Sequence, residues 1–194
     1  MWIIAPVWVI IIIIAIILSH PKIKGLIGEW RVRKQLRRLP EENYKVLNDI
    51  TLRGKKGTSQ IDHLVVSPYG IFVIETKNYN GWIHGSEDSE YWFQTFYKHK
   101  TKFRNPIKQN WSHIYAMKEN LPEYKDVAYH PVIVFVGKGK LKNLDVTTDV
   151  IYSDALFESI ISHARRAPSN HENGLYYTFS SYLHGRRSVS NWCC

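Results

Sequence analysis

The sequence has little cysteine and lacks several local signatures that identify common protein classes. Its two cysteines, Cys193 and Cys194, are adjacent at the end of the chain. Adjacent cysteines cannot join distant segments, so a disulfide framework is excluded, and this usage suits a reducing compartment. The chain also has no glycine-rich phosphate loop, no cysteine pattern typical of zinc sites and no local Ser/His/Asp motif. These absences leave charge, hydrophobic pattern and residue spacing as the informative features.

Acidic residues are scarce relative to basic ones. The 194 residues include 26 Lys and Arg against 17 Asp and Glu, for a net charge of +9 at pH 7. Such an excess indicates a polyanionic partner, either nucleic acid or an acidic membrane surface. A hydrophobic content of 44% with 22% charged residues is typical of globular proteins and excludes a disordered, collagen-like or coiled-coil chain.

The chain begins with a long apolar run. Residues 2–18 read WIIAPVWVIIIIIAIIL and carry no charge. As a helix this run would be roughly 25 Å long, enough for a single membrane pass. A signal peptide is disfavoured because no basic residue precedes the run and no small-x-small cleavage site follows it. A buried core helix is disfavoured because no face of the run is polar. We therefore predict one transmembrane helix.

Basic residues follow the apolar run. Lys and Arg outnumber acids by seven to one between residues 19 and 38. Positive charge is retained on the cytoplasmic side, so we expect a single-pass protein of the cell membrane with its domain in the cytoplasm. The remaining residues suffice for one well-buried domain. The predicted organisation is a transmembrane anchor (2–18), a basic juxtamembrane linker (19–24), a core (25–140), a C-terminal strand and helix part of the same domain (141–185) and a tail (186–194).

Hydrophobic periodicity and turn residues predict an α/β domain. Asn105 is a suitable N-cap with Pro106 at the first helical position, and Ser153 is a candidate cap for a last helix. The continuously apolar run 131–136 is typical of a strand covered on both faces. The predicted helices are 25–39, 106–121 and Ser153 to about Ala164, and the predicted strands are 44–52, 60–66, 71–79, 131–136 and 149–152.

Strands 60–66 and 71–79 are joined by a four-residue turn, which predicts their register. If the two ends of the turn face each other, then Asp62 lies opposite Glu75. Residues two apart on a strand share a face, so the hairpin would gather four polar side chains: Gln60, Asp62, Glu75 and Lys77. Two opposed carboxylates are destabilising unless a cation lies between them. Lys77 is one candidate for that cation and a divalent ion such as Mg²⁺ is another.

A simpler interpretation of this patch is an ion-pair cluster centred on Lys77 on a solvated sheet face. The apolar residues Ile71 and Val73 would share that face, which argues against it. Glu29 poses a similar choice, because it lies within the apolar stripe of the first helix. It either pairs with Arg33 at i+4 or serves the site.

The pattern Asp62…Glu75-x-Lys77 resembles the D…ExK signature of the PD-(D/E)XK nuclease superfamily, and the surrounding residues make the resemblance more specific. Over about residues 25–140 the chain resembles the nuclease-related domain, or NERD, family. The motifs that carry this resemblance are Gly28-Glu29, Gln60-Ile61-Asp62-His63, Gly70-Ile71-Phe72-Val73-Ile74-Glu75-Thr76-Lys77-Asn78, Gly81, Trp92, Asn105-Pro106 and Gln109.

The resemblance implies a restriction-endonuclease-like mixed sheet flanked by helices and metal-dependent hydrolysis of phosphodiester bonds. It implies that Asp62, Glu75 and the Thr76 carbonyl bind Mg²⁺, with Mn²⁺ as a substitute. Lys77 would orient or deprotonate the attacking water or offset charge in the transition state. Glu29 would act through water or a second ion, and Gln109 would position a ligand or the substrate.

Further basic and aromatic residues suit a nucleic-acid partner, with DNA the favoured polymer. Residues 91–111 interleave rings with cations, and we expect the rings to pack in the core and the lysines to hold phosphates. His63 and His113 are interpreted as structural residues, although His113 follows Gln109 at i+4. The candidate nucleic-acid contacts are Gln60, Arg53, Lys55, Lys56, Lys98, Lys100, Lys102 and Arg104.

Two other functions remain open at this point. A non-catalytic nucleic-acid-binding or adaptor module would keep the nuclease-like fold without cleavage. A membrane-surface scaffold would use the basic first helix to bind anionic lipid, with an affinity that falls at high salt. Neither of these two proteins would cleave nucleic acid, so metal-dependent cleavage would identify a nuclease.

Overall fold

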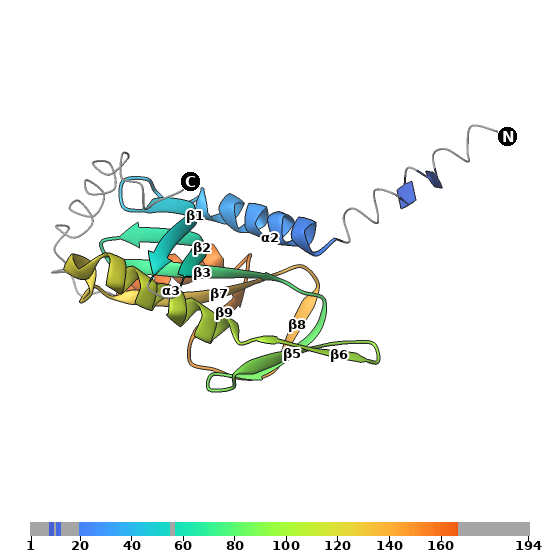
Figure 1. Cartoon of the computed structure of the whole chain (residues 1–194). Helices are drawn as coiled ribbons and strands as arrows, with labels where there is room; N and C mark the ends of the chain where they lie inside the picture. The colour runs from blue at the N-terminus through green and yellow to red at the C-terminus, as the bar shows by residue number, and fades with distance from the viewer. Residues whose placement is uncertain (1–7, 10, 13–19, 55–56, 167–194) are drawn as a thin grey trace.

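The computed structural model describes residues 8–9, 11–12, 20–54 and 57–166 (Figure 1). Its helices are α2 (Pro21–Leu36), α3 (Pro106–Asn120), the short 3₁₀ helix η1 (Pro122–Tyr124) and α4 (Leu156–Arg166). Its strands are β1 (Lys45–Gly54), β2 (Gly57–Ser67), β3 (Gly70–Asn78), β4 (Gly81–Ser86), β5 (Tyr91–Phe96), β6 (His99–Arg104), β7 (Tyr129–Val136), β8 (Gly139–Asp145) and β9 (Asp149–Tyr152).

The strands form two sheets. The central sheet has the order β1-β2-β3-β7-β9, and the small sheet has the order β6-β5-β4-β8. In the central sheet β1, β2 and β3 are antiparallel neighbours, whereas β7 runs parallel to both β3 and β9. The predicted mixed sheet flanked by helices is confirmed for the central sheet. The small sheet was not predicted.

Helices cover both faces of the central sheet (Figure 1). Helix α3 packs on one face through Ile114 and Met117, which contact Leu64 and Val73 in one buried cluster. Helices α2 and α4 pack on the other face, where Val32 and Ile160 join a second buried cluster. This double coverage explains why β3 and β7 are apolar along most of their length.

The small sheet packs one of its faces against the edge of this core. Trp92 is fully buried and lies parallel to the Phe135 ring, with 6.3 Å between ring centroids. Gly85 makes this possible, because a Cβ atom there would lie 2.3 Å from the Trp92 ring. Ile83 and Ile107 complete the contact between the small sheet, α3 and the central sheet.

Asn105 joins the two sheets at the start of α3. Its Oδ1 accepts a hydrogen bond from the Ile107 amide at 2.9 Å, so the predicted N-cap is confirmed. Its Nδ2 lies 2.7 to 3.2 Å from three carbonyl oxygens of the β4–β5 loop: Ser86, Glu87 and Ser89. The side chain is fully buried, and it fixes the helix start to that loop.

Several predicted element boundaries differ from the structure. Helix α2 already begins at Pro21, so residues 21–24 of the predicted linker are helical, as Pro at the first helical position favours. It ends at Leu36 rather than residue 39, and it buries Gly28, Val32 and Leu36 while Leu26 is exposed. Helix α4 begins at Leu156, after Ala155, whose carbonyl accepts from the Ser159 amide; Ser153 is therefore not its cap.

Within the described residues, no helix is long and apolar enough to cross a membrane. The anchor predicted at residues 2–18 falls largely outside the described residues. The predicted tail (186–194) and residues 167–185 of the segment that precedes it also lie outside them.

Candidate active site

The β2–β3 hairpin confirms the predicted register only near its turn. Ser67 pairs with Gly70, and the ladder continues to His63 opposite Ile74, where it ends. The predicted pairing of Gln60 with Lys77 therefore does not form. Gln60 is exposed and pairs with Thr51 on the other side of β2.

A local bend separates β2 from β3 at this level. The β1–β2 ladder skips the Asp49–Asp62 position, and Asp49 has a φ of 53°, in the left-handed region. Beyond the bend β2 continues with β1 and no longer pairs with β3. The β2-facing edge of β3 therefore has no ladder partner at Glu75, Thr76 and Lys77.

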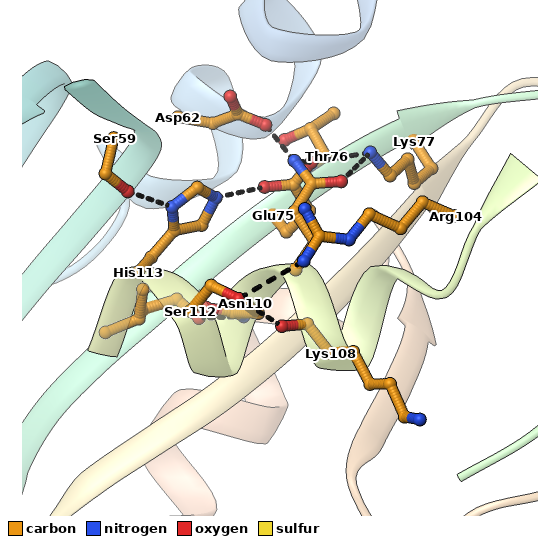
Figure 2. Close-up of polar contacts among 12 residues, drawn as sticks. Ser59, Asp62, Glu75, Thr76, Lys77, Arg104, Lys108, Asn110, Ser112 and His113 are labelled. Atoms are coloured by element: carbon orange, nitrogen blue, oxygen red, sulfur yellow. Dashed lines mark hydrogen bonds and ion pairs between the residues drawn. The ribbon is translucent and has the colours of Figure 1, made fainter. Parts of the chain in front are cut away.

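Asp62 fills part of the gap left by the ended ladder. Its Oδ2 accepts a hydrogen bond from the Thr76 amide at 2.8 Å, which replaces a strand–strand contact (Figure 2). Burial and, next, the nearby Glu75 carboxylate raise the pKa of Asp62 to about 7, against the opposing effect of the Thr76 amide. Asp62 thus lies beside Glu75 as predicted, although not as a cross-strand pair.

Glu75 is the most heavily bonded residue of the site. It is 3% exposed, and its Oε1 accepts from Lys77 Nζ at 2.6 Å and from Gln109 Nε2 at 2.7 Å. Its Oε2 lies 3.2 Å from His113 Nε2. Burial alone would raise the pKa of this carboxyl, but the contacts with His113 and Lys77 outweigh burial and hold the pKa below its ordinary value.

Lys77 is held between two partners. Its ammonium donates to Glu75 Oε1 and, at 3.0 Å, to Gln109 Oε1. Gln109 therefore donates to the carboxylate with its amide nitrogen and accepts from the lysine with its oxygen. The side chain of Lys77 is 16% exposed, so its ammonium is directed by these contacts more than by bulk water. The structure thus brings Glu75, Lys77 and Gln109 together, and their roles stay predictions.

His113 contacts the site residues, whereas the sequence predicts only a structural role for it. Its Nδ1 lies 2.6 Å from Ser59 Oγ, so Ser59, His113 and Glu75 form a chain of hydrogen bonds from β2 through α3 to β3 (Figure 2). The i+4 spacing from Gln109 was the available signal for His113. Ser59 carries no such signal, because its position depends on how far β2 diverges from β3.

Glu29 lies at the margin of the site on α2. Arg33 is 4.0 Å from Glu29, as the i+4 spacing predicted, but Arg33 makes a closer ion pair with Asp49. Burial, together with Asp49, raises the pKa of Glu29, and its charge contributes to the raised pKa of Asp62. Gly28 allows α2 to approach β3, because a Cβ there would lie 3.2 Å from Asn78 Cβ and 3.3 Å from Thr76 Cγ2.

The predicted nucleic-acid contacts are dispersed. Arg53 is exposed on β1, whereas Lys55 and Lys56 lie outside the described residues. Gln60 is exposed on β2, and the remaining four predicted contacts (Lys98, Lys100, Lys102 and Arg104) belong to the β5–β6 hairpin of the small sheet. Arg104 is the last residue of β6, and its guanidinium donates to Ser112 Oγ of α3 at 3.5 Å.

The polar groups of the site fit a hard divalent cation. Among the described residues Asp62 accepts a hydrogen bond only at Oδ2, and Thr76 Oγ1 is buried without a partner. Burial and then the Glu75 carboxylate raise the pKa of Asp62, and a bound cation would lower it. In the described part of the chain no group of three or more His, Cys, Asp and Glu side chains could hold a metal by itself. A site of two carboxylates would therefore depend on backbone carbonyl and water, as Mg²⁺ sites commonly do.

Comparisons with known proteins identify the family of the chain. The chain is 38% identical over 167 residues to an uncharacterized protein of Bacillus anthracis. The aligned region covers 81% of this chain and 76% of the relative. No solved structure matches the chain significantly, so its likeness to restriction endonucleases stays a prediction. Residues 24–136, more than half of the chain, match the nuclease-related domain. The chain therefore belongs to the nuclease-related domain (NERD) family.

Proposed function

We propose that this chain is a metal-dependent nuclease that hydrolyses phosphodiester bonds of nucleic acid, with DNA the favoured polymer. The observation that carries the proposal is the position of Lys77. Its ammonium lies 2.6 Å from Glu75 and 3.0 Å from Gln109, beside a second carboxylate, Asp62, whose pKa is raised to about 7. A lysine next to two carboxylates, on a strand edge without a ladder partner, suits an enzyme that hydrolyses phosphate esters.

Asp62, Glu75 and the Thr76 carbonyl are the groups that would hold Mg²⁺, with Mn²⁺ as a substitute. All three are oxygen ligands, which these ions prefer. When bound, the ion supplies Lewis acidity and lowers the pKa of a coordinated water. Glu75 retains capacity for this role, because a carboxylate can accept about four contacts.

The remaining residues position these groups and compensate charge. Lys77 would hold the attacking water or a phosphate oxygen and offset the negative charge that develops in the transition state. Gln109 fixes the positions of the Lys77 and Glu75 side chains relative to each other through its two hydrogen bonds. Glu29, at the margin of the site, would contribute through water.

The proposed setting is the cytoplasmic face of the cell membrane, with residues 2–18 as anchor. The support is the uncharged run and the basic residues that follow it. Arg53, Lys55 and Lys56 would then contact the backbone of the substrate.

The test is cleavage by the purified full chain in detergent micelles. Supercoiled plasmid, linear duplex, single-stranded DNA and RNA are each incubated with Mg²⁺, Mn²⁺ or EDTA. We expect metal-dependent cleavage that falls at least about 10³-fold in Glu75→Ala and in Lys77→Ala, because each removes a group that acts on the reacting phosphate.

The chain offers a matched control for these variants. Glu90 and Lys108 also form a Glu–Lys pair, with 3.4 Å between Lys108 Nζ and Glu90 Oε2, but both side chains are substantially exposed. Glu90→Ala and Lys108→Ala should therefore cleave at the native rate. Cleavage that persists in EDTA or in Glu75→Ala would refute the proposal. Binding without cleavage of any substrate would favour the non-catalytic adaptor.

A further inference from the structure

The small sheet has one covered face and one open face. Along β5 the residues alternate, with Trp92 fully buried and its neighbour Tyr91 45% exposed. Along β4, Ile83 is fully buried whereas Trp82 is 48% exposed. The covered face packs on the core, so the side chains of Trp82 and Tyr91 lie on the face that no described element covers.

The two middle strands of this open face carry aromatic rings. Register places His84 of β4 beside Phe93 of β5, and Phe93 is two residues from Tyr91 on the same face. Trp82 lies two residues from His84. A hollow of about 290 Å³ adjoins Trp82 and is lined also by Phe96 and Tyr97. These rings are not needed to fill the core.

The two flanking strands carry lysines. On β6, Lys100 Nζ lies 4.2 Å from the centroid of the Phe93 ring, and Lys102 Nζ lies 4.9 Å from that of Tyr91. On β8, Lys142 Nζ lies 4.2 Å from the Trp82 ring centroid, and Lys140 is the ladder partner of Trp82. We call this surface the ring-and-lysine face, made up of Trp82, Tyr91, Phe93, Lys100, Lys102, Lys140 and Lys142.

The charge of this face has one sign along most of its length. Its four lysines are exposed, and none forms an ion pair within the described part of the chain. The register brings one acid near it, Asp145, opposite Ser86 at the end of β4. Positive charge that rests on rings instead of on carboxylates remains available to an anion.

We propose that the ring-and-lysine face binds single-stranded nucleic acid. Unpaired bases would stack on the exposed rings and displace the ammonium groups from them, and those groups would then contact the phosphates. A duplex encloses the faces of its bases, so it would use the lysines but not the rings. Rings between two rows of lysines therefore favour a single strand over a duplex.

The position of the face suits delivery of a strand to the proposed site, and only this biological use rests on the proposed function. Strand β6 ends at Arg104 and leads directly into α3, which carries Gln109. The ring-and-lysine face and Gln109 therefore lie on consecutive elements of the chain.

The test measures binding without cleavage. The full chain in detergent micelles and EDTA is titrated into a fluorescein-labelled 20-nucleotide oligothymidylate, an oligouridylate of the same length and a 20-base-pair duplex. We expect Trp82→Ala to weaken binding of both single strands about 10-fold, the usual size of one lost base–ring stack, and to leave duplex affinity unchanged. Trp82→Phe should restore most of the affinity. Lys102→Gln with Lys142→Gln should lower the salt dependence of single-strand binding by roughly 1.4 logarithmic units per decade.

Trp30→Ala is the matched control, because Trp30 is 60% exposed on α2 and also lies near a lysine, with Lys34 Nζ 6.0 Å from its ring centroid. It should bind as the native chain does. Native affinity in both Trp82→Ala and Tyr91→Ala would overturn the proposal, as would an equal loss of duplex binding. Binding to phosphatidylglycerol vesicles without oligonucleotide binding would instead identify a membrane contact. Binding is measured in EDTA without cleavage, so a failed binding test leaves the cleavage test intact, and the reverse.

Discussion

The central sheet and the small sheet differ in the burial and the partners of their charged side chains. In the central sheet both faces are covered, and the buried Glu75 is fixed by three side-chain contacts, with Lys77, Gln109 and His113. In the small sheet one face is open, and its lysines rest on rings. Burial demands a complete set of partners for each charge, and a fixed geometry follows from it. Exposure demands none, so the open face can exchange its contacts for those of a ligand.

The largest expected effect separates the two faces of the small sheet. Trp92→Ala should lower the free energy of unfolding by about 3–5 kcal/mol, since it leaves a cavity against Phe135 and loses the 2.9 Å hydrogen bond to the Ser86 carbonyl. Trp82→Ala should change it by less than about 0.5 kcal/mol. Denaturant unfolding of the two variants makes the measurement. Similar losses in both would mean that the open face is covered in solution.

The central sheet should reveal the raised pKa of Asp62 through the pH dependence of its stability. The folded pKa of Asp62 is about 7, above the ordinary 3.8, so in EDTA its contribution to stability is present below about pH 4 and is lost as the pH rises through 7. Asp62→Asn mimics the neutral carboxyl. It should match the native chain near pH 4 and exceed its free energy of unfolding at pH 8 by about 2–4 kcal/mol.

Thermal unfolding at several pH values tests this expectation. Mg²⁺ at saturating concentration should raise the melting temperature of the native chain at pH 8 and leave that of Asp62→Asn unchanged, because the ligand has lost its charge. A difference between variant and native that stays constant from pH 4 to pH 8 would contradict the assigned environment of Asp62.

His113 tests how far the buried contacts orient Glu75. His113→Ala removes the link from Ser59 to Glu75 and should reduce metal-dependent cleavage about 10–100-fold, as loss of an outer contact to a metal ligand typically does. Binding of single strands in EDTA should not change. Single-turnover cleavage with saturating substrate measures the cleavage step separately from binding. A native cleavage rate in His113→Ala would show that His113 contributes only to packing.

Two glycines of α2 give the smallest expected difference. A Cβ at Gly25 would meet nothing within 4 Å, whereas one at Gly28 would press on β3. Gly25→Ala should raise the free energy of unfolding by up to about 1 kcal/mol through helix propensity, whereas Gly28→Ala should lower it by about 1 kcal/mol. Equal gains in both variants would show that α2 can move away from β3 without loss.

The sequence predicted much of the central sheet and its site, for identifiable reasons. Continuous apolar runs fixed β3 and β7, and turn residues 67–70 fixed the hairpin register as far as His63. Beyond that point the predicted register does not continue: the β2–β3 ladder ends at His63, and the β1–β2 ladder skips the next position, where Asp49 has a φ of 53°. Asp62 still reached Glu75, since a carboxylate can bond to a free strand edge.

The small sheet escaped prediction because rings occupy both of its faces. Trp92 and Tyr91 are adjacent, one buried and one exposed, so the segment lacks the apolar–polar alternation that signals a half-buried strand. For the same reason the expectation that the rings of residues 91–111 pack in the core holds for Trp92 and is wrong for Tyr91. Strand β8 also contributes lysines from a distant part of the sequence, which only the parallel β4–β8 pairing reveals.

Asn105 couples local unfolding of the small sheet to local unfolding at the start of α3. Its side chain bonds at once to the first turn of α3 and to three carbonyls of the β4–β5 loop. Neither segment can detach without stranding buried polar groups of the other. The amides of β4, β5 and the first turn of α3 should therefore exchange with deuterium in a single cooperative event. Single-stranded nucleic acid bound to the small sheet should slow exchange at the amide of Gln109.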